Sequence, residues 1–287
     1  MLERAIELRD NVANGRSGPE EHTIDHSARV YNDVFEMPPN EDNPSPIVRI
    51  NKMNPSNDSV NRDILSKEEF EALMSAAGVS ADDTLILYGD NNNNNWFAAF
   101  GFWICKIYGH NDVRLMNGGR VKWLNEDDKE LVTDPVNPTP TEYKAADPDW
   151  SLRTYVKDVM GASSGDSRNL VDVRSPAEFT GEVIAPPGMS ETAQRGGHIP
   201  GAKNVPWATA VAEDGTFHQA DELRGIYIVK QGVDTSKPTI AYCRIGERSS
   251  HTWFVLKYLL GIKDVRNYDG SWTEYGNLIG APIEKPN

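Results

Sequence analysis

The chain has 287 residues, enough for two domains of ordinary size, and 38% of them are hydrophobic while 25% are charged. This balance is typical of a globular protein and excludes a disordered chain. The formal net charge of −14 argues against nucleic-acid binding through a broad basic surface, because phosphate contacts need clustered lysine and arginine. Such acidity also occurs on the solvated surfaces of halophilic proteins, and an ordinary acidic protein fits nearly as well.

Only two cysteines are present, Cys105 and Cys243, too few for a secreted disulfide scaffold of this length. Cys105 lies in an apolar helical stretch, residues 100–108, which predicts a core thiol. The first ten residues lack the apolar segment of a signal peptide, and no run of about 18 apolar residues occurs in the chain. We therefore expect a protein of the reducing cytoplasm that does not associate with a membrane.

In the first half, residues 84–90 are a predicted strand and residues 96–108 a predicted helix, followed by the segment 109–123. Residues 134–150 contain four prolines and no apolar periodicity, which predicts an interdomain linker. We expect an N-terminal domain over residues 1–133, this linker, and a C-terminal domain over residues 151–287.

The second half opens with a predicted strand at residues 169–174, which ends in an acid and a base. Ser175 is a predicted N-cap, Pro176 a first-turn proline, and Glu178 completes a capping box with Ser175, so a helix should begin here. Residues 196–207 predict a turn that delivers a short strand. Farther on, residues 239–242 are a short apolar run typical of a buried strand.

The two halves repeat one pattern. After each strand and helix comes a segment that aligns without a gap, residues 109–123 on 261–275, which places Asp112 on Asp264 and Gly118 on Gly270. Strands alternating with helices at this spacing predict an α/β fold with a mainly parallel sheet flanked by helices in each domain. The aligned run indicates a duplicated domain.

The duplication is chemically unequal. Where the second half carries Cys243, the first carries Asp90, followed by the asparagine run 91–95. An aspartate has no nucleophilic sulfur, and the asparagines lack the arginines that would hold an anion. We expect the first domain to be a non-catalytic copy that serves packing and helps to wall the cleft; a separate binding loop is the less favoured alternative.

Cys243 lies between the end of a predicted strand and a predicted helix at residues 249–260. Free backbone N–H groups and the positive end of the helix dipole favour a thiolate there. Arg244 and Arg248 act in the same direction, while Glu247 opposes them. Four residues separate Cys243 from Arg248. A tyrosine phosphatase loop needs five, so this smaller cradle favours attack on a terminal sulfur over attack on phosphorus.

Four segments together resemble the rhodanese family, and more narrowly its two-domain thiosulfate sulfurtransferases of the bacterial and archaeal type. They are the loop Cys243–Phe254, the turn Gly197–Ala202, the strand end Val171–Pro176 and the segment Asn267–Trp272. The resemblance covers roughly residues 62 to the C-terminus and implies tandem rhodanese-like domains. Residues 1–45 do not match the family, so the first domain is expected to be atypical.

The resemblance implies transfer of the sulfane sulfur of thiosulfate, through a Cys243 persulfide, to cyanide or another thiophilic acceptor such as a thiol. The backbone amides around the sulfur, with Arg248 on the sulfonate end and Arg244 at the mouth, would form the anion site. The expected substrate-binding residues are Arg248, Arg244, Ile245, Gly246, Glu247, Ser249 and Arg174. Neither a metal nor an organic cofactor is implied.

Two alternatives stay open, a 3-mercaptopyruvate sulfurtransferase and a persulfide sulfur carrier. The charged loop favours an inorganic dianion over 3-mercaptopyruvate. Some family members carry an additional arginine four positions after the Asp-x-Arg strand end, where this chain has Glu178. Arg174 or Arg195 would then bind the anionic donor in place of that arginine, or neither residue would do so. Of the histidines, His198 is expected to be structural, and His251 to occupy a solvent-exposed helix position.

Overall fold

The computed structural model describes residues 63–89, 95–126, 138–163, 165, 167–185 and 193–286. They fall into two compact units: the first extends to Asp149 and includes Glu213–Thr216, and the second comprises Trp150–Ala212 and the residues from Phe217 onward. The predictions made for residues 1–45 and for Asp90 lie outside the described residues.

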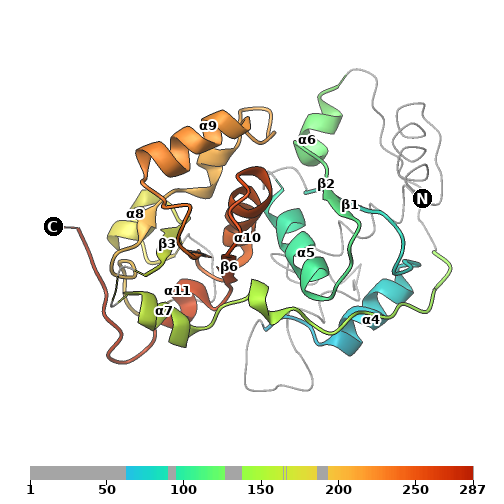
Figure 1. Cartoon of the computed structure of the whole chain (residues 1–287), viewed down its shortest axis with the longest axis horizontal. Helices are drawn as coiled ribbons and strands as arrows, with labels where there is room; N and C mark the ends of the chain where they lie inside the picture. Colours follow the sequence, from blue (N-terminus) through green and yellow to red (C-terminus); the bar gives the residue numbers. More distant parts are fainter. Residues whose placement is uncertain are drawn as a thin grey trace. The chain divides into compact units, whose positions relative to one another are not determined.

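The first unit contains, in chain order, α4 (Lys67–Ala76), β1 (Leu85–Leu87), α5 (Trp96–Ile107), β2 (Val113–Leu115) and α6 (Gly119–Leu124). The two strands pair in parallel (Figure 1). Helix α5 is apolar on all sides and almost completely buried, as expected for a helix packed within a core. Cys105 in this helix is fully buried, which confirms the prediction of a core thiol.

The second unit contains a larger sheet. Its elements are η1 (Trp150–Leu152), α7 (Val156–Ser163), β3 (Asn169–Asp172), α8 (Pro176–Thr180), β4 (Lys203–Asn204), η2 (Trp207–Ala210), α9 (Ala220–Arg224), η3 (Gly225–Lys230), β5 (Thr239–Tyr242), α10 (Glu247–Phe254), η4 (Val255–Leu259), β6 (Val265–Tyr268) and α11 (Ser271–Tyr275). The strand order is β4-β3-β5-β6, and every pair is parallel. The predicted parallel α/β architecture is confirmed for this unit.

Helices cover the sheet of the second unit. Helix α10 packs against β5 and β6, and α7 packs against β3. In Figure 1, α7 and α11 lie together below this sheet. The core behind the sheet is formed by Val159, Ala162, Leu170, Ala193, Ile199, Ile240, Tyr242, Tyr268, Trp272, Tyr275 and Ala281.

The parallel register brings three strand ends to one edge. Asp172 at the end of β3 pairs with Tyr242 at the end of β5, which pairs with Tyr268 at the end of β6. The loops that follow these strands therefore leave the sheet at the same level. Ligand sites of parallel α/β sheets form at this carboxyl edge.

Local sequence signals locate several elements well. Strand β5 has the predicted bounds, and Ser175 and Glu178 form the predicted capping box at the start of α8. The helix after the cysteine begins at Glu247, two residues before the predicted start, because Gly246 takes a left-handed conformation and ends the loop there. Residues 255–259 continue it as a π-helical turn, which the sequence pattern did not indicate.

The described part of the predicted linker, residues 138–149, contains no helix or strand. It is bound to the first unit by backbone hydrogen bonds along its length. The Thr141 N–H donates to the Ser75 carbonyl at 3.0 Å, and the Asp149 N–H donates to the Ile107 carbonyl at 2.8 Å. This segment is therefore an extended part of the first unit.

The aligned segments of the two halves share local geometry. In each unit the first residue of the strand before the helix, β1 or β5, donates its N–H at 2.8 Å to the carbonyl of the aligned aspartate, Asp112 or Asp264. Each aspartate also pairs with the arginine two residues later, Arg114 at 2.9 Å and Arg266 at 3.0 Å. Such matching contacts are what duplication of a β-α-β unit would leave.

Candidate active site

The cysteine loop connects β5 to α10 at the carboxyl edge of the larger sheet. Its last residue, Gly246, has φ = 91° and is the N-cap of α10. A Cβ at this position would lie 2.4 Å from the Cα of Asp269, so only glycine fits. The loop is therefore held directly against the segment that follows β6.

Backbone amides surround the sulfur of Cys243. The side chain is fully buried, and the Gly246 N–H donates to its Sγ at 3.1 Å. Burial raises the pKa of the Cys243 thiol. The Arg248 charge and hydrogen bonds from Ser249 and Ile245 lower this pKa, and together they outweigh burial, so that the pKa lies below its ordinary value. The predicted thiolate character of Cys243 thus has a physical cause in the loop.

The segment after β6 supports the loop from behind. The Cys243 N–H donates to Ser271 Oγ at 3.0 Å, and Ser271 Oγ donates to the Tyr268 carbonyl at 2.6 Å. Two backbone bonds, from Trp272 N–H to the Cys243 carbonyl and from Thr273 N–H to the Arg244 carbonyl, fix the path of the chain. The resemblance named this segment, but sequence reasoning gave it no role.

Asn267 in β6 is a second contributor that sequence reasoning missed. Its side-chain amide donates to the Gly246 carbonyl at 2.9 Å, and its Oδ1 accepts from Ser249 Oγ at 2.6 Å. Ser249 belongs to the predicted anion site, and Asn267 fixes its hydroxyl. The available signal was an asparagine that occupies a buried position in a short strand, because a buried polar side chain needs hydrogen-bond partners.

Arg248 pairs with the carboxylate of Glu178 at the start of α8. Its Nη1 donates to Oε2 at 3.0 Å and its Nη2 to Oε1 at 2.8 Å, in a two-pronged ion pair. Both side chains are largely buried, 14% and 2% exposed. The structure thus brings Arg248 to Cys243, as the spacing predicted, and adds an acidic partner from a remote helix.

Arg244 and Glu247, the other charged residues of the loop, are both buried. We expected Arg244 to lie at the mouth of the site, but its side chain is only 5% exposed. Its charge therefore acts from within the unit. Glu247 opens α10 and places a negative charge in the first turn, where the helix dipole favours it.

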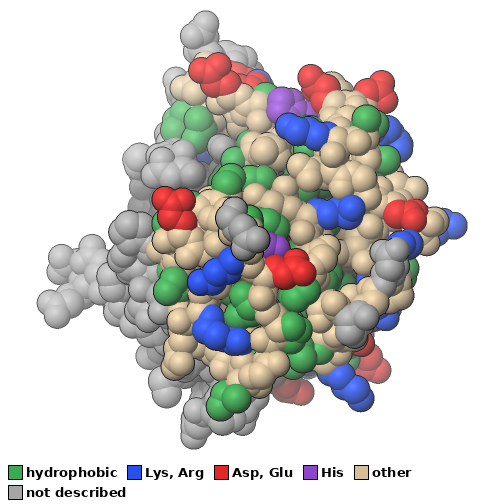
Figure 2. Space-filling model, turned by 90° about the vertical axis from the view of Figure 1, so that its left-hand side faces the viewer, with side chains coloured by type: hydrophobic (Ala, Val, Ile, Leu, Met, Phe, Trp, Pro, Cys, Tyr) green, Lys and Arg blue, Asp and Glu red, His purple; other side chains and the backbone are tan. Residues whose placement is uncertain are grey.

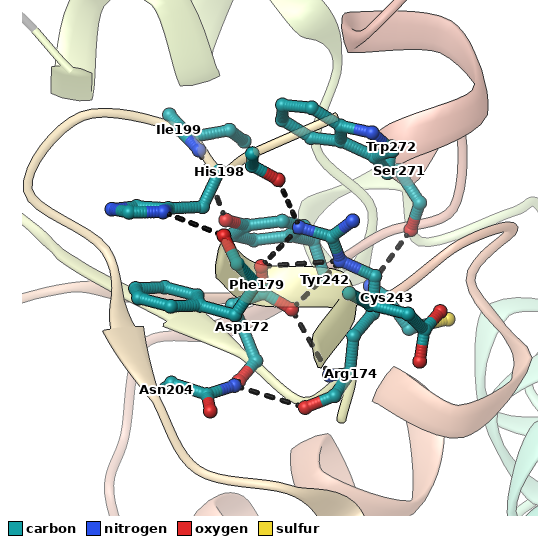
Figure 3. A network of polar contacts seen from close by, with 12 residues as sticks. Asp172, Arg174, Phe179, His198, Ile199, Asn204, Tyr242, Cys243, Ser271 and Trp272 are labelled. Carbon is teal, nitrogen blue, oxygen red and sulfur yellow. Dashed lines mark hydrogen bonds and ion pairs between the residues drawn. The ribbon is translucent and has the colours of Figure 1, made fainter. Parts of the chain in front are cut away.

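Arg174 lies in a buried network rather than in the loop (Figure 3). Its guanidinium forms an ion pair with Asp172 at 2.6 Å, donates to the Gly197 carbonyl at 2.7 Å and lies over the ring of Trp272. Both members of the pair are fully buried. These contacts give Arg174 a structural role in joining the edge of β3 to the turn before β4.

Arg195 also has structural contacts, because its guanidinium donates to the carbonyls of Gly276, Leu278 and Ala281. His198 stacks on Phe179 and bonds to its carbonyl through Nδ1 at 2.9 Å. The structural role predicted for this histidine agrees with these contacts.

The prediction of a solvent-exposed His251 is wrong. The imidazole is fully buried against the rings of Trp207 and Phe217, and neither ring nitrogen has a hydrogen-bond partner in the described part of the chain. Burial lowers its pKa to about 3, so the ring is neutral. Helical periodicity marked its position on α10, but Trp207 of η2 and Phe217, both remote in the sequence, cover that face.

The described residues contain no group of three or more histidine, cysteine, aspartate or glutamate side chains that could hold a metal ion. Among the same residues, none of the helices has the length and apolar character needed to cross a membrane. Figure 2 shows one face of the molecule, on which the described acidic and basic side chains are interspersed. That face carries no broad basic patch of the kind that binds nucleic acid.

Comparisons with known proteins agree with this geometry. Residues 154–278 match the family model of the rhodanese-like domain. The chain is 54% identical over 240 residues to "Putative thiosulfate sulfurtransferase" of Saccharopolyspora erythraea, covering 83% of each chain. It is 53% identical to "Sulfur carrier protein TtuD" of Thermus thermophilus, covering 79% of this chain and 80% of the relative.

Solved structures are similar as well, among them one from Escherichia coli. The crystal structure of SseA from Escherichia coli, described as a 3-mercaptopyruvate sulfotransferase with the rhodanese fold, superposes with a TM-score of 0.64. The two sequences are 31% identical, over 75% of this chain and 77% of that one.

Proposed function

The chain belongs to the rhodanese family of sulfurtransferases, and on this premise we propose that it moves the sulfane sulfur of thiosulfate to a thiophilic acceptor through a persulfide on Cys243. The observation that carries the proposal is the buried Cys243 thiol, whose pKa the loop lowers below its ordinary value. A thiolate is the nucleophile that this chemistry needs.

In the first step, the Cys243 thiolate attacks the outer sulfur of thiosulfate. A sulfur–sulfur bond forms to Sγ, the sulfur–sulfur bond of thiosulfate breaks, and sulfite leaves with the electron pair. In the second step, cyanide or a thiolate attacks the outer sulfur of the persulfide, and the Cys243 thiolate is regenerated. Neither step needs a general base, because the nucleophile is already deprotonated.

The loop would stabilise both anionic species. The amides of Ile245, Gly246 and Ser249 point to the sulfur and would hold the charge on it. Arg248 would attract the sulfonate end of the donor, and Arg244 would add positive potential. We assign no substrate contact to Arg174, whose guanidinium is bound to Asp172 in the buried network.

The test is turnover of thiosulfate and cyanide by the purified protein, measured as release of sulfite and thiocyanate. We expect the wild type to turn over and Cys243→Ser to lose essentially all activity, because serine is not a nucleophile at neutral pH. Cys105→Ser is the matched control and should retain activity, since that thiol lies in the core of the first unit. Full activity in Cys243→Ser would exclude the mechanism.

Two related functions are favoured by the similar proteins. The relative named a sulfur carrier supports a protein that receives persulfide sulfur from another enzyme and passes it on. The similarity to SseA supports 3-mercaptopyruvate as the donor. Comparing kcat/KM for thiosulfate and for 3-mercaptopyruvate distinguishes the two possible enzymes. A carrier is favoured if the isolated protein already bears a persulfide and shows negligible turnover of both small donors.

We also propose that the two units are tandem rhodanese-like domains, of which only the second is catalytic. The shared pairing of Asp112 with Arg114 and of Asp264 with Arg266 supports this duplication. The reducing cytoplasm is the proposed location, because it keeps Cys243 free to react.

A further inference from the structure

The charge available to a donor at the cysteine loop depends on what Arg248 already binds. Arg248 acts on Cys243, since its charge is the largest of the effects that lower the pKa of that thiol. Its two terminal nitrogens, however, both donate to the Glu178 carboxylate, at 3.0 and 2.8 Å. The end-on face of the guanidinium, formed by its two terminal nitrogens, is therefore already bound to a group of the protein itself and is not available to a sulfonate.

Glu178 is a fixed partner rather than a mobile surface group. Its side chain is 2% exposed, and its Oε2 also accepts from the Ser175 N–H at 3.0 Å and the Ser175 hydroxyl at 2.9 Å. Burial raises the pKa of Glu178. The effects of Arg248 and Ser175 lower this pKa and together outweigh burial, so that the pKa lies below its ordinary value. At neutral pH Glu178 therefore carries a negative charge, and it binds the same guanidinium that acts on the reacting sulfur.

No surplus positive charge compensates for it among the described residues of the loop and its supports. Within the loop, Arg244 is opposed by Glu247, both of them buried. Behind the loop, two further arginines are each paired with a carboxylate: the fully buried Arg174 with Asp172 at 2.6 Å, and the partly buried Arg153 with Asp269 at 2.7 Å. A dianion that approaches Cys243 meets a balanced set of charges, and Glu178 is the negative member closest to the guanidinium that would receive it.

We propose that Glu178 is a specificity-determining residue that selects against dianionic sulfur donors. The favoured class carries a single negative charge or none at the end that transfers sulfur, as a persulfide of a thiol does. Thiosulfate remains a donor, but with a higher KM than the loop would give without Glu178. The inference rests on the proposed sulfurtransferase function and uses a repulsive group to set specificity.

The test compares thiosulfate, a dianion, with 3-mercaptopyruvate, a monoanion, in the wild type and in Glu178→Gln. The glutamine keeps an oxygen acceptor for Ser175 and Arg248 but removes the charge. We expect the ratio of kcat/KM for thiosulfate to kcat/KM for 3-mercaptopyruvate to rise at least about threefold, with the change mainly in the KM for thiosulfate. An unchanged ratio would overturn the proposal.

Two variants separate charge from structure. Glu178→Asp keeps the charge and should keep the wild-type ratio; a rise in that variant would show that geometry, and not charge, sets the preference. Glu69→Gln is the matched control for the capping box, because Glu69 occupies the same place relative to Ser66 at the start of α4 in the first unit. It should leave the ratio unchanged.

A binding measurement keeps the outcome independent of turnover. Calorimetric titration of thiosulfate into Cys243→Ser, with and without Glu178→Gln, measures the dissociation constant of a donor that cannot react. We expect binding to tighten at least about threefold when the charge is removed. If the wild type shows no turnover, the proposed function fails, while the titration still decides the role of Glu178: equal dissociation constants refute it.

Discussion

At the scale of single residues, the reactivity of Cys243 depends on opposing effects at one sulfur atom. Complete burial favours the neutral thiol, whereas the Arg248 charge and the surrounding N–H groups favour the thiolate, and the second set prevails. The charge of Arg248 is the largest of the effects that lower this pKa. Arg248 should therefore be the residue whose loss changes the titration of the thiol most.

This predicts how alkylation of Cys243 depends on pH. In a Cys105→Ala background, where Cys243 is the only thiol, the rate with iodoacetamide should rise with pH to a plateau. Its midpoint should lie below the value of about 8.5 for a free cysteine. Arg248→Gln should raise that midpoint by about one pH unit or more, because burial then acts with less opposition.

Arg248→Lys keeps the charge and should give a midpoint between the two. Arg266→Gln is the control, since Arg266 pairs with Asp264 at the start of β6, away from the sulfur. Equal midpoints for the wild type and Arg248→Gln would show that the amides alone set the pKa.

The residues that sequence reasoning found are those whose signal is local. Cys243 and Arg248 could be predicted from their spacing along one loop. Asn267 and Ser271, the pairing of Arg248 with Glu178, and the burial of His251 could not, because each depends on segments remote in the chain that only the folded sheet brings together.

At the scale of elements, the loop between β5 and α10 has its shape because Gly246 turns the chain into the helix while touching the backbone of Asp269. This close approach places the amides around the sulfur and lets the segment after β6 hold the carbonyls of Cys243 and Arg244. The geometry of the anion site and the packing of α10 therefore both depend on the absence of a side chain at Gly246.

Gly246→Ala should accordingly destabilise the protein by about 2–4 kcal/mol, because a Cβ adds both a backbone overlap and an unfavourable positive φ. Urea unfolding gives the free-energy difference. Gly225→Ala is the matched control: Gly225 has a helical conformation with open space around it, so alanine there should stabilise by about 0.5–1 kcal/mol. A Gly246→Ala variant as stable as the wild type would contradict the close approach.

The positions of helices and strands could be predicted where the capping or apolar pattern is local. Examples are α8, with its capping box of Ser175 and Glu178, and β5. The start of α10 was placed two residues late, since the left-handed Gly246 depends on its contact with Asp269. The π-helical turn at residues 255–259 has no periodic signature of its own. Boundaries set by tertiary contacts are therefore the part that the pattern leaves open.

At the scale of the whole molecule, one of the two units contains the cysteine loop, and its parallel sheet brings the loops after β3, β5 and β6 to one edge. The parallel α/β architecture of this unit could be predicted from alternating strands and helices. The proposed division of labour between a catalytic unit and a non-catalytic copy leaves a single sulfur atom to carry the intermediate. All of the proposed chemistry should thus be traceable to a change at Cys243.

The most direct measurement is the mass of the Cys243 peptide after the protein is treated with thiosulfate. We predict that this peptide gains the mass of one sulfur atom, loses it again when cyanide is added, and that the peptide containing Cys105 does not change. The Cys243→Ser protein should show no gain. A protein that releases sulfite while the Cys243 peptide stays unmodified, or that carries the added sulfur elsewhere, would contradict a persulfide mechanism at Cys243.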